Sequence, residues 1–104
     1  MEVYRINISD LAKKDIRDTV TYIANEFQEP AVAEKTSDTI IDAIFTLEDM
    51  PDRIGLVKDK RLAEKGIRPL YINNYTVFFR IDKPTKVVDV VRVLYSRRDW
   101  ASLL

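Results

Sequence analysis

Cysteine and histidine are both absent from this sequence of 104 residues. Without cysteine, the chain forms neither a disulfide framework nor a zinc site built from thiolates. Without histidine, it has no Ser-His-Asp triad and no imidazole that could act as a general base near neutral pH. Catalysis by this chain would therefore depend on other side chains, and the sequence indicates no metal and no other cofactor.

Long apolar runs are missing as well. The first residues lack the apolar region of a secretory signal, and no run approaches the roughly 20 residues of a membrane-spanning helix. Hydrophobic residues make up 46% of the chain and charged residues 33%, which is typical of a globular protein. We expect a single domain over residues 1–104, located in the cytoplasm and without a membrane partner.

The formal net charge is zero, but each half of the chain is poor in one sign of charge. Residues 1–50 hold five Lys or Arg and eleven Asp or Glu, a charge of −6, whereas residues 51–104 hold twelve and six, a charge of +6. This division predicts one electropositive face and a partner of opposite sign. The alternative is that the halves attract each other or expose ordinary solvated charges.

The first half begins with a strand and a helix. Residues 3–8 alternate in polarity and predict a strand with Tyr4, Ile6 and Ile8 on one face. Ser9 is a suitable N-cap for the helix that follows and ends near Gln28-Glu29. The apolar residues of this helix recur at spacings of three and four and predict one inward face: Ile16, Val20, Ile23 and Phe27.

A second helix should follow directly. Pro30 suits its first position, and Met50-Pro51 ends it. The predicted inward stripe contains Ala33, Thr36, Ile40, Ile44 and Leu47. Because the link between the helices is so short, they should form an antiparallel hairpin. Many of the remaining positions on the hairpin are acidic and are expected to be solvent-facing: Asp15, Asp18, Glu34, Asp38 and Asp42.

The second half changes to the pattern of strands after a basic segment. Residues 51–65 have no clear period and predict a mobile basic loop with Arg53, Lys58, Lys60, Arg61 and Lys65. Strands are predicted at Ile67–Ile72, Tyr75–Ile81 and Val87–Tyr95, with Asn73-Asn74 as a tight turn. Pro69 lacks an amide donor and marks an edge strand, whereas the strand Val87–Tyr95 is apolar on nearly both faces and should be central.

These elements predict an α+β fold with the order β-α-α-β-β-β. A helical hairpin would cover one side of a mainly antiparallel four-stranded sheet.

The last predicted strand ends in residues that bind phosphate and stack on bases. Tyr95, Arg97 and Arg98 follow the β-branched run directly, so a buried strand would hold them on a rigid support. The alternative for the arginines is an ion pair at the strand end that includes Asp99. Trp100 is expected to cover the apolar end of the strand.

The order of elements and several short motifs resemble the RelE/ParE superfamily of bacterial toxins. The motifs are Ile8-Ser9, Tyr22-Ile23-Ala24, Pro30-x-x-Ala33, Leu47-x-x-Met50-Pro51, Gly66-Ile67-Arg68, Tyr75-x-Val77-Phe78-Phe79-Arg80 and Arg92-Val93-Leu94-Tyr95-Ser96-Arg97-Arg98-Asp99. The resemblance covers nearly the whole chain. It implies the toxin of a type II toxin–antitoxin module that is held inactive by a cognate antitoxin protein.

The superfamily has two kinds of target, and the resemblance implies one or the other. RelE-like members enter the ribosomal A site and promote mRNA cleavage, whereas ParE-like members inhibit DNA gyrase. We slightly prefer metal-independent, ribosome-dependent mRNA cleavage, because the second half of the chain is basic and Arg68 could cluster with Arg97, Arg98 and Tyr95. The alternatives are a non-enzymatic inhibitor of gyrase, and a degenerate relative that only binds an antitoxin.

Cleavage of RNA requires stabilisation of a pentavalent phosphate and protonation of the leaving oxygen. Candidates for the first role are the arginines Arg68, Arg97 and Arg98, because the guanidinium forks match phosphate geometry. Tyr95 could stack on a base or donate a proton. Further candidates for RNA or phosphate binding are Lys58, Lys60, Arg61 and Arg80. The alternative for the lysines is simple solvation, and for Arg80 and Arg92 a packed stem with a solvated head.

Overall fold

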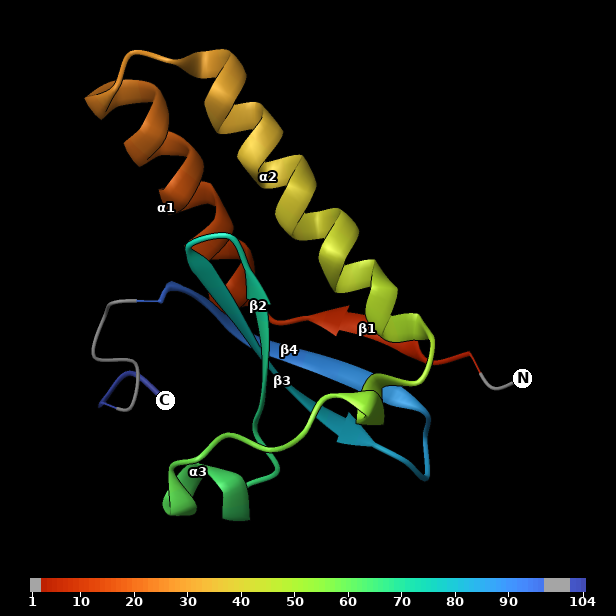
Figure 1. Ribbon diagram of the computed structural model, residues 1–104. Coiled ribbons are helices and arrows are strands. Elements are labelled where there is room, and N and C mark those ends of the chain that lie inside the picture. The colour runs from red at the N-terminus through yellow and green to blue at the C-terminus, as the bar shows by residue number, and fades with distance from the viewer. Residues whose placement is uncertain (1–2, 97–101) are drawn as a thin grey trace.

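The computed structural model describes residues 3–96 and 102–104. The main elements are β1 (Arg5–Ile8), α1 (Asp10–Glu26), α2 (Pro30–Phe45), α3 (Lys60–Glu64), β2 (Arg68–Ile72), β3 (Tyr75–Asp82) and β4 (Val87–Tyr95). The strands form one sheet in the order β1-β4-β3-β2, in which β1 is parallel to β4 and the other pairs are antiparallel. The predicted fold class and strand order along the chain are confirmed (Figure 1).

Helices α1 and α2 form the predicted hairpin over one face of the sheet (Figure 1). The Ser9 hydroxyl caps α1 by accepting a hydrogen bond of 3.0 Å from the Ala12 amide, which satisfies one of the free N–H groups of the first turn. Ile40, Ile44 and Phe79 are at most 1% exposed in the core between helices and sheet. Among the helices of the described residues, none is long and apolar enough to cross a bilayer.

Phe27 was predicted to face inward, and this is wrong. Its side chain is 62% exposed, whereas Ile16 and Ile23 of the same stripe are buried. The helical period is continuous, but the end of the hairpin with the α1–α2 link extends beyond the sheet (Figure 1). The last turn of α1 therefore has no sheet residues beneath it, and periodicity alone does not reveal where the underlying layer stops.

The segment 51–65 was predicted to be a loop without regular structure, and this is also wrong. It contains a 3₁₀ turn, Pro51–Arg53, and the short helix α3. The Asp59 side chain caps α3 by accepting from the Leu62 amide at 3.1 Å, and Leu62 is fully buried. Arg53 donates to the backbone carbonyls of three residues in the preceding turn, Thr46, Asp49 and Met50. A cap followed by one apolar residue was the available signal for α3.

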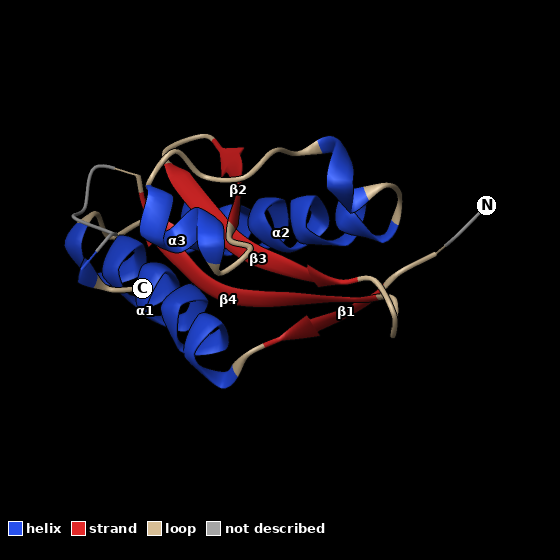
Figure 2. Ribbon diagram, turned by 90° about the horizontal axis from the view of Figure 1, so that it is seen from below, coloured by secondary structure: helices blue, strands red, loops and turns tan. Residues whose placement is uncertain are grey.

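The sheet has β4 at its centre and β2 at one edge, as predicted (Figure 2). Asn73 has a positive φ of 52° in the turn between β2 and β3, a conformation that asparagine tolerates. The register between β3 and β4 shifts at Phe78/Phe79, so that Phe78 faces Arg92 and Phe79 faces Val90. Val91 is thus an extra residue in β4, and the resulting bulge changes the direction of the strand.

A second apolar cluster lies on the face of the sheet opposite the hairpin. Leu62 of α3, Phe78 of β3 and Leu94 of β4 are its most buried members. Leu103 and Leu104 pack against the same cluster. The sheet is therefore covered on both faces, by the long hairpin on one and by α3 with the final residues on the other.

Candidate functional site

Two of the residues predicted to cleave RNA, Arg68 and Tyr95, lie in the described part of the chain, and they lie apart in the sheet. Arg68 lies in the row of the sheet that contains Phe79, whereas Tyr95 lies in the row of Tyr75. These rows are four residues apart along β3, which corresponds to about 14 Å at the rise of a β-strand. Tyr95 therefore lies at the end of β4, whereas Arg68 lies opposite the middle of β3. Arg97 and Arg98, the other two candidates, lie outside the described residues.

Arg68 and Arg80 both line one recess, although the register points their side chains to opposite faces of the sheet. A recess of about 450 Å³ lies where β2 begins and β3 ends, and we call it the basic recess after its four cationic residues. These are Lys65, Arg68, Arg80 and Lys83. Asp82 and Asp89 also line it, so its charge is partly balanced. The Arg68 guanidinium donates to the Ile54 carbonyl, so one of its N–H groups is used by a hydrogen bond within the protein.

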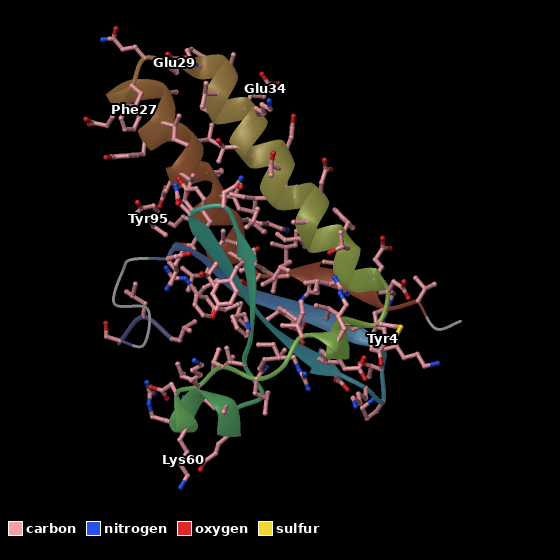
Figure 3. All side chains as sticks on the ribbon, in the orientation of Figure 1. Tyr4, Phe27, Glu29, Glu34, Lys60 and Tyr95 are labelled. Carbon is pink, nitrogen blue, oxygen red and sulfur yellow. The ribbon has the colours of Figure 1, made fainter. Side chains whose placement is uncertain are left out.

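The remaining predicted phosphate-binding residues are distributed around α3. Lys60 and Arg61 belong to α3 itself, and both are exposed. Lys58 lines a separate groove of about 400 Å³ between residues 54–58 and the edge strand β2. The other residues of this groove are largely apolar and include Leu56, Pro69 and Tyr71. Lys58, Lys60 and Arg61 thus lie at the α3 end of the molecule, and Figure 3 shows Lys60 far from Tyr95.

Asp15 and Arg92 form a buried ion pair, contrary to both sequence expectations. The Arg92 Nε and Nη2 atoms donate to the two carboxylate oxygens of Asp15 at 2.8 and 2.9 Å. The side chains are only 14% and 9% exposed. These hydrogen bonds raise the pKa of Arg92, although burial acts in the opposite direction. Asp15 is therefore not solvent-facing, and the Arg92 head does not extend into solvent.

The reason for this pair is the free edge of β4. Strand β1 pairs with β4 only as far as Val90, so beyond that point β4 has a neighbouring strand, β3, on one side only. The Asp15 carboxylate accepts the Val93 amide at 2.9 Å, and the Ser9 hydroxyl donates to the Val91 carbonyl at 3.1 Å. Side chains of α1 and its cap thus take the place of the missing strand, because buried backbone groups need partners.

Arg92 also connects this edge to the end of the chain. Its Nη1 atom donates to the Leu103 carbonyl at 3.2 Å. One guanidinium group therefore joins α1, β4 and the residues that pack on the second apolar cluster. The arginine is part of the scaffold rather than available for a phosphate group.

Tyr22, Tyr75 and Tyr95 form a tyrosine cluster where the hairpin meets the end of β4. The rings of Tyr75 and Tyr95 contact edge to face, with centroids 5.7 Å apart. Burial is the main cause that raises the pKa of Tyr75, and the neighbouring Tyr95 and Tyr22 phenols add to it. A raised pKa keeps Tyr75 protonated, so it can donate a hydrogen bond but is a poor base. The spacing of the tyrosines along the sequence does not reveal this cluster, because its members come from three elements.

Titration of Tyr75 is expected to weaken the fold in alkaline solution. Its folded-state pKa lies above the ordinary value of 10.0, so between these values the unfolded chain has lost a proton that the folded chain retains. The free energy of unfolding should therefore fall as the pH rises above about 10. Urea titrations from pH 8 to 11 should show that Tyr75→Phe removes part of this fall. A difference between wild type and variant that is constant with pH would contradict the assignment.

Comparison with known proteins identifies the family. Residues 6–100 match the model of the ParE toxin of the type II toxin–antitoxin system parDE. The chain belongs to the ParE toxin family. The match extends from β1 through the end of β4, so it covers the hairpin, the sheet and the tyrosine cluster of this ParE-family chain. Among curated proteins, none matches the sequence.

Solved structures with the same fold include two from toxin–antitoxin systems. One is from the chromosomal ParDE system of P. aeruginosa, with a TM-score of 0.75 and 16% identity over 89% of this chain and 96% of that chain. The other is from the toxin–antitoxin complex RelBE2 of Mycobacterium tuberculosis, with a TM-score of 0.65 and 18% identity over 91% and 93% of the two chains. At these identities the likeness concerns the fold of the ParE-family chain.

Proposed function

We propose that this ParE-family toxin is neutralised by a cognate antitoxin and arrests growth by inhibiting DNA gyrase without cutting RNA. The observation that carries the choice of target is the separation of Arg68 from Tyr95. Phosphate stabilisation and proton donation must act on one phosphate at the same time. The rows that hold these two groups are about 14 Å apart along β3. Inhibition by binding requires only a shaped surface, and it needs no general base.

An antitoxin partner is supported by the charge and shape of the second half of the chain. Exposed cations occur on α3 and around the basic recess, and the apolar groove beside the edge strand β2 adds a surface for aliphatic side chains. An amphipathic segment with acidic residues would fit both features. We expect such a segment in the small protein encoded beside this chain.

The gyrase proposal predicts that the purified toxin blocks supercoiling of relaxed plasmid by purified gyrase. The antitoxin should restore supercoiling when it is added in equimolar amount, because it removes free toxin. Growth should stop when the toxin is induced alone. Full supercoiling at saturating toxin would falsify this target, and unimpaired growth with soluble toxin would instead support a degenerate relative that binds only the antitoxin.

Ribosome-dependent mRNA cleavage is the second candidate, and the basic recess favours it. Lys65, Arg80 and Lys83 are exposed and line this recess, so they could hold a phosphate of mRNA. This candidate predicts codon-positioned cuts in toeprinting on translating ribosomes. The cuts should be lost in Arg68→Ala with Arg80→Ala, and in Arg97→Ala or Arg98→Ala, but retained in Arg5→Ala, which removes an exposed cation on β1. Intact message with the wild-type toxin would exclude cleavage.

A further inference from the structure

The end of the helical hairpin carries exposed aromatic and apolar side chains. Tyr22, Phe27 and Val32 are 58%, 62% and 48% exposed. The rings of Tyr22 and Phe27 contact edge to face, with centroids 5.9 Å apart and planes at 82°. Two large rings are thus held against each other in solvent, and neither contributes to the core. Exposed aromatic groups that are fixed in position are typical of protein-binding surfaces.

The charges closest to these rings in the sequence are mainly acidic. Residues 19–34 contain Glu26, Glu29 and Glu34 and no Lys or Arg, and the exposed Lys35 is the first cation after them. The three carboxylates are exposed. Figure 3 shows Phe27, Glu29 and Glu34 at one end of the molecule and Lys60 of α3 at the opposite end. We call the first of these ends the hairpin tip, and define it by Tyr22, Phe27, Val32, Glu26, Glu29 and Glu34.

The charge of the hairpin tip determines which kind of partner it fits. Nucleic acid is disfavoured, because its phosphates would be repelled by the three carboxylates. An antitoxin with acidic residues fits the basic end of the molecule better than this one. The tip therefore suits a partner protein whose surface has basic residues around an apolar pocket. The protein that the toxin inhibits is a candidate for this partner.

We propose that the hairpin tip is the surface through which this toxin binds gyrase, with the Phe27 and Tyr22 rings entering an apolar pocket and the glutamates facing a basic rim. This inference rests on the proposed function. It assigns inhibition to one end of the molecule and antitoxin binding to the other. The aromatic pair supplies apolar contact, and the carboxylates supply orientation and association rate.

The test measures binding of toxin variants to purified gyrase by biolayer interferometry, together with inhibition of supercoiling. Tyr22→Ala with Phe27→Ala should weaken binding at least about 30-fold, the loss expected for an interface hot spot. The control for an exposed aromatic outside the tip is Phe45→Ala, whose side chain is 46% exposed. This control should bind gyrase as the wild type does.

A second variant tests the charge and does not touch the rings. Glu26→Lys with Glu29→Lys and Glu34→Lys should weaken binding about tenfold or more, mainly through slower association. Raising the salt concentration should weaken binding of the wild type more than binding of this variant. The control is Glu64→Lys on α3, which changes an exposed glutamate at the other end of the molecule.

The outcomes separate this inference from the proposed function. No binding of gyrase by the wild type would end the gyrase proposal itself. Wild-type binding that is unchanged in both tip variants would overturn the inference but leave the gyrase proposal standing. Loss of antitoxin binding together with gyrase binding would also overturn it, because the two partners are assigned to different ends. Should the alanine variant fail to fold, the charge-reversal variant decides.

Discussion

Asp15→Ala is expected to lower the free energy of unfolding by about 3–5 kcal/mol, the range for removing one partner of a buried ion pair. The change leaves the Arg92 guanidinium without its carboxylate and the buried Val93 amide without its acceptor. Both groups were desolvated on folding, so neither recovers its hydration in the folded state. Urea unfolding followed by circular dichroism, with linear extrapolation to water, measures the loss.

The matched control is Asp18→Ala on the same helix. Asp18 also forms an ion pair, with Lys14 at 2.7 Å, but both side chains are 62% exposed. Exposed pairs contribute little, so this change should alter stability by less than about 1 kcal/mol. Equal losses at the two positions would contradict the burial argument. Asp15→Leu with Arg92→Met should be less harmful than Asp15→Ala, because no unpaired charge remains.

Phe79→Ala should have a similarly large effect, a loss of about 3–5 kcal/mol, because it removes a large ring from the core. Phe79 is fully buried in the cluster between the hairpin and the sheet. Phe27→Ala should change stability by no more than about 0.5 kcal/mol, as is usual for surface positions. Midpoints of thermal and urea unfolding for the two variants, measured side by side, test this contrast.

The Phe27 result also bears on function. A loss of more than about 2 kcal/mol in Phe27→Ala would mean that the ring is part of the core, and the hairpin tip would then lose one of its two aromatic residues. A small loss would show that the ring is dispensable for folding. Its position at an exposed tip would then have to be explained by something other than stability.

The two ends of this molecule have different chemistry, and the sheet keeps them apart. The hairpin tip is acidic and aromatic, whereas α3 and the basic recess present cations. The tyrosine cluster lies where the hairpin crosses the end of β4. A toxin that must bind both an antitoxin and a target can use such separate surfaces without changing shape. Binding of one partner could then exclude the other sterically, even where the two partners contact different residues of the toxin.

Local signals in the sequence predicted the elements well. The chemistry of a few adjacent residues determines several of these features: the Ser9 cap of α1, the start of α2 at Pro30, the turn at Asn73 between β2 and β3, and the edge position of Pro69. Periodic spacing within each helix likewise predicted the inward residues, Ile16 in α1 and Ile40 and Ile44 in α2. α3 was missed because it is five residues long and has a single buried apolar residue.

The candidate site could be predicted less well, because it depends on residues far apart in the chain. Asp15 and Arg92 are separated by 77 positions, and nothing local to either residue indicates that β1 leaves part of β4 uncovered. Arg68 was predicted to lie near the strand end of β4, but the antiparallel register places it opposite Phe79, four residues along β3 from the row of Tyr95.

The sequence by itself determined the α+β class, the order of the long elements, the edge and central strands, and the division of charge between the two halves. It could do so because periodicity, capping and turn preferences act over a few residues. Only the tertiary structure decided that Phe27 is exposed, that Asp15 completes the edge of β4, and that Arg68 lies opposite Phe79, away from Tyr95. These outcomes follow from strand register and from the length of one layer relative to another, which no local pattern records.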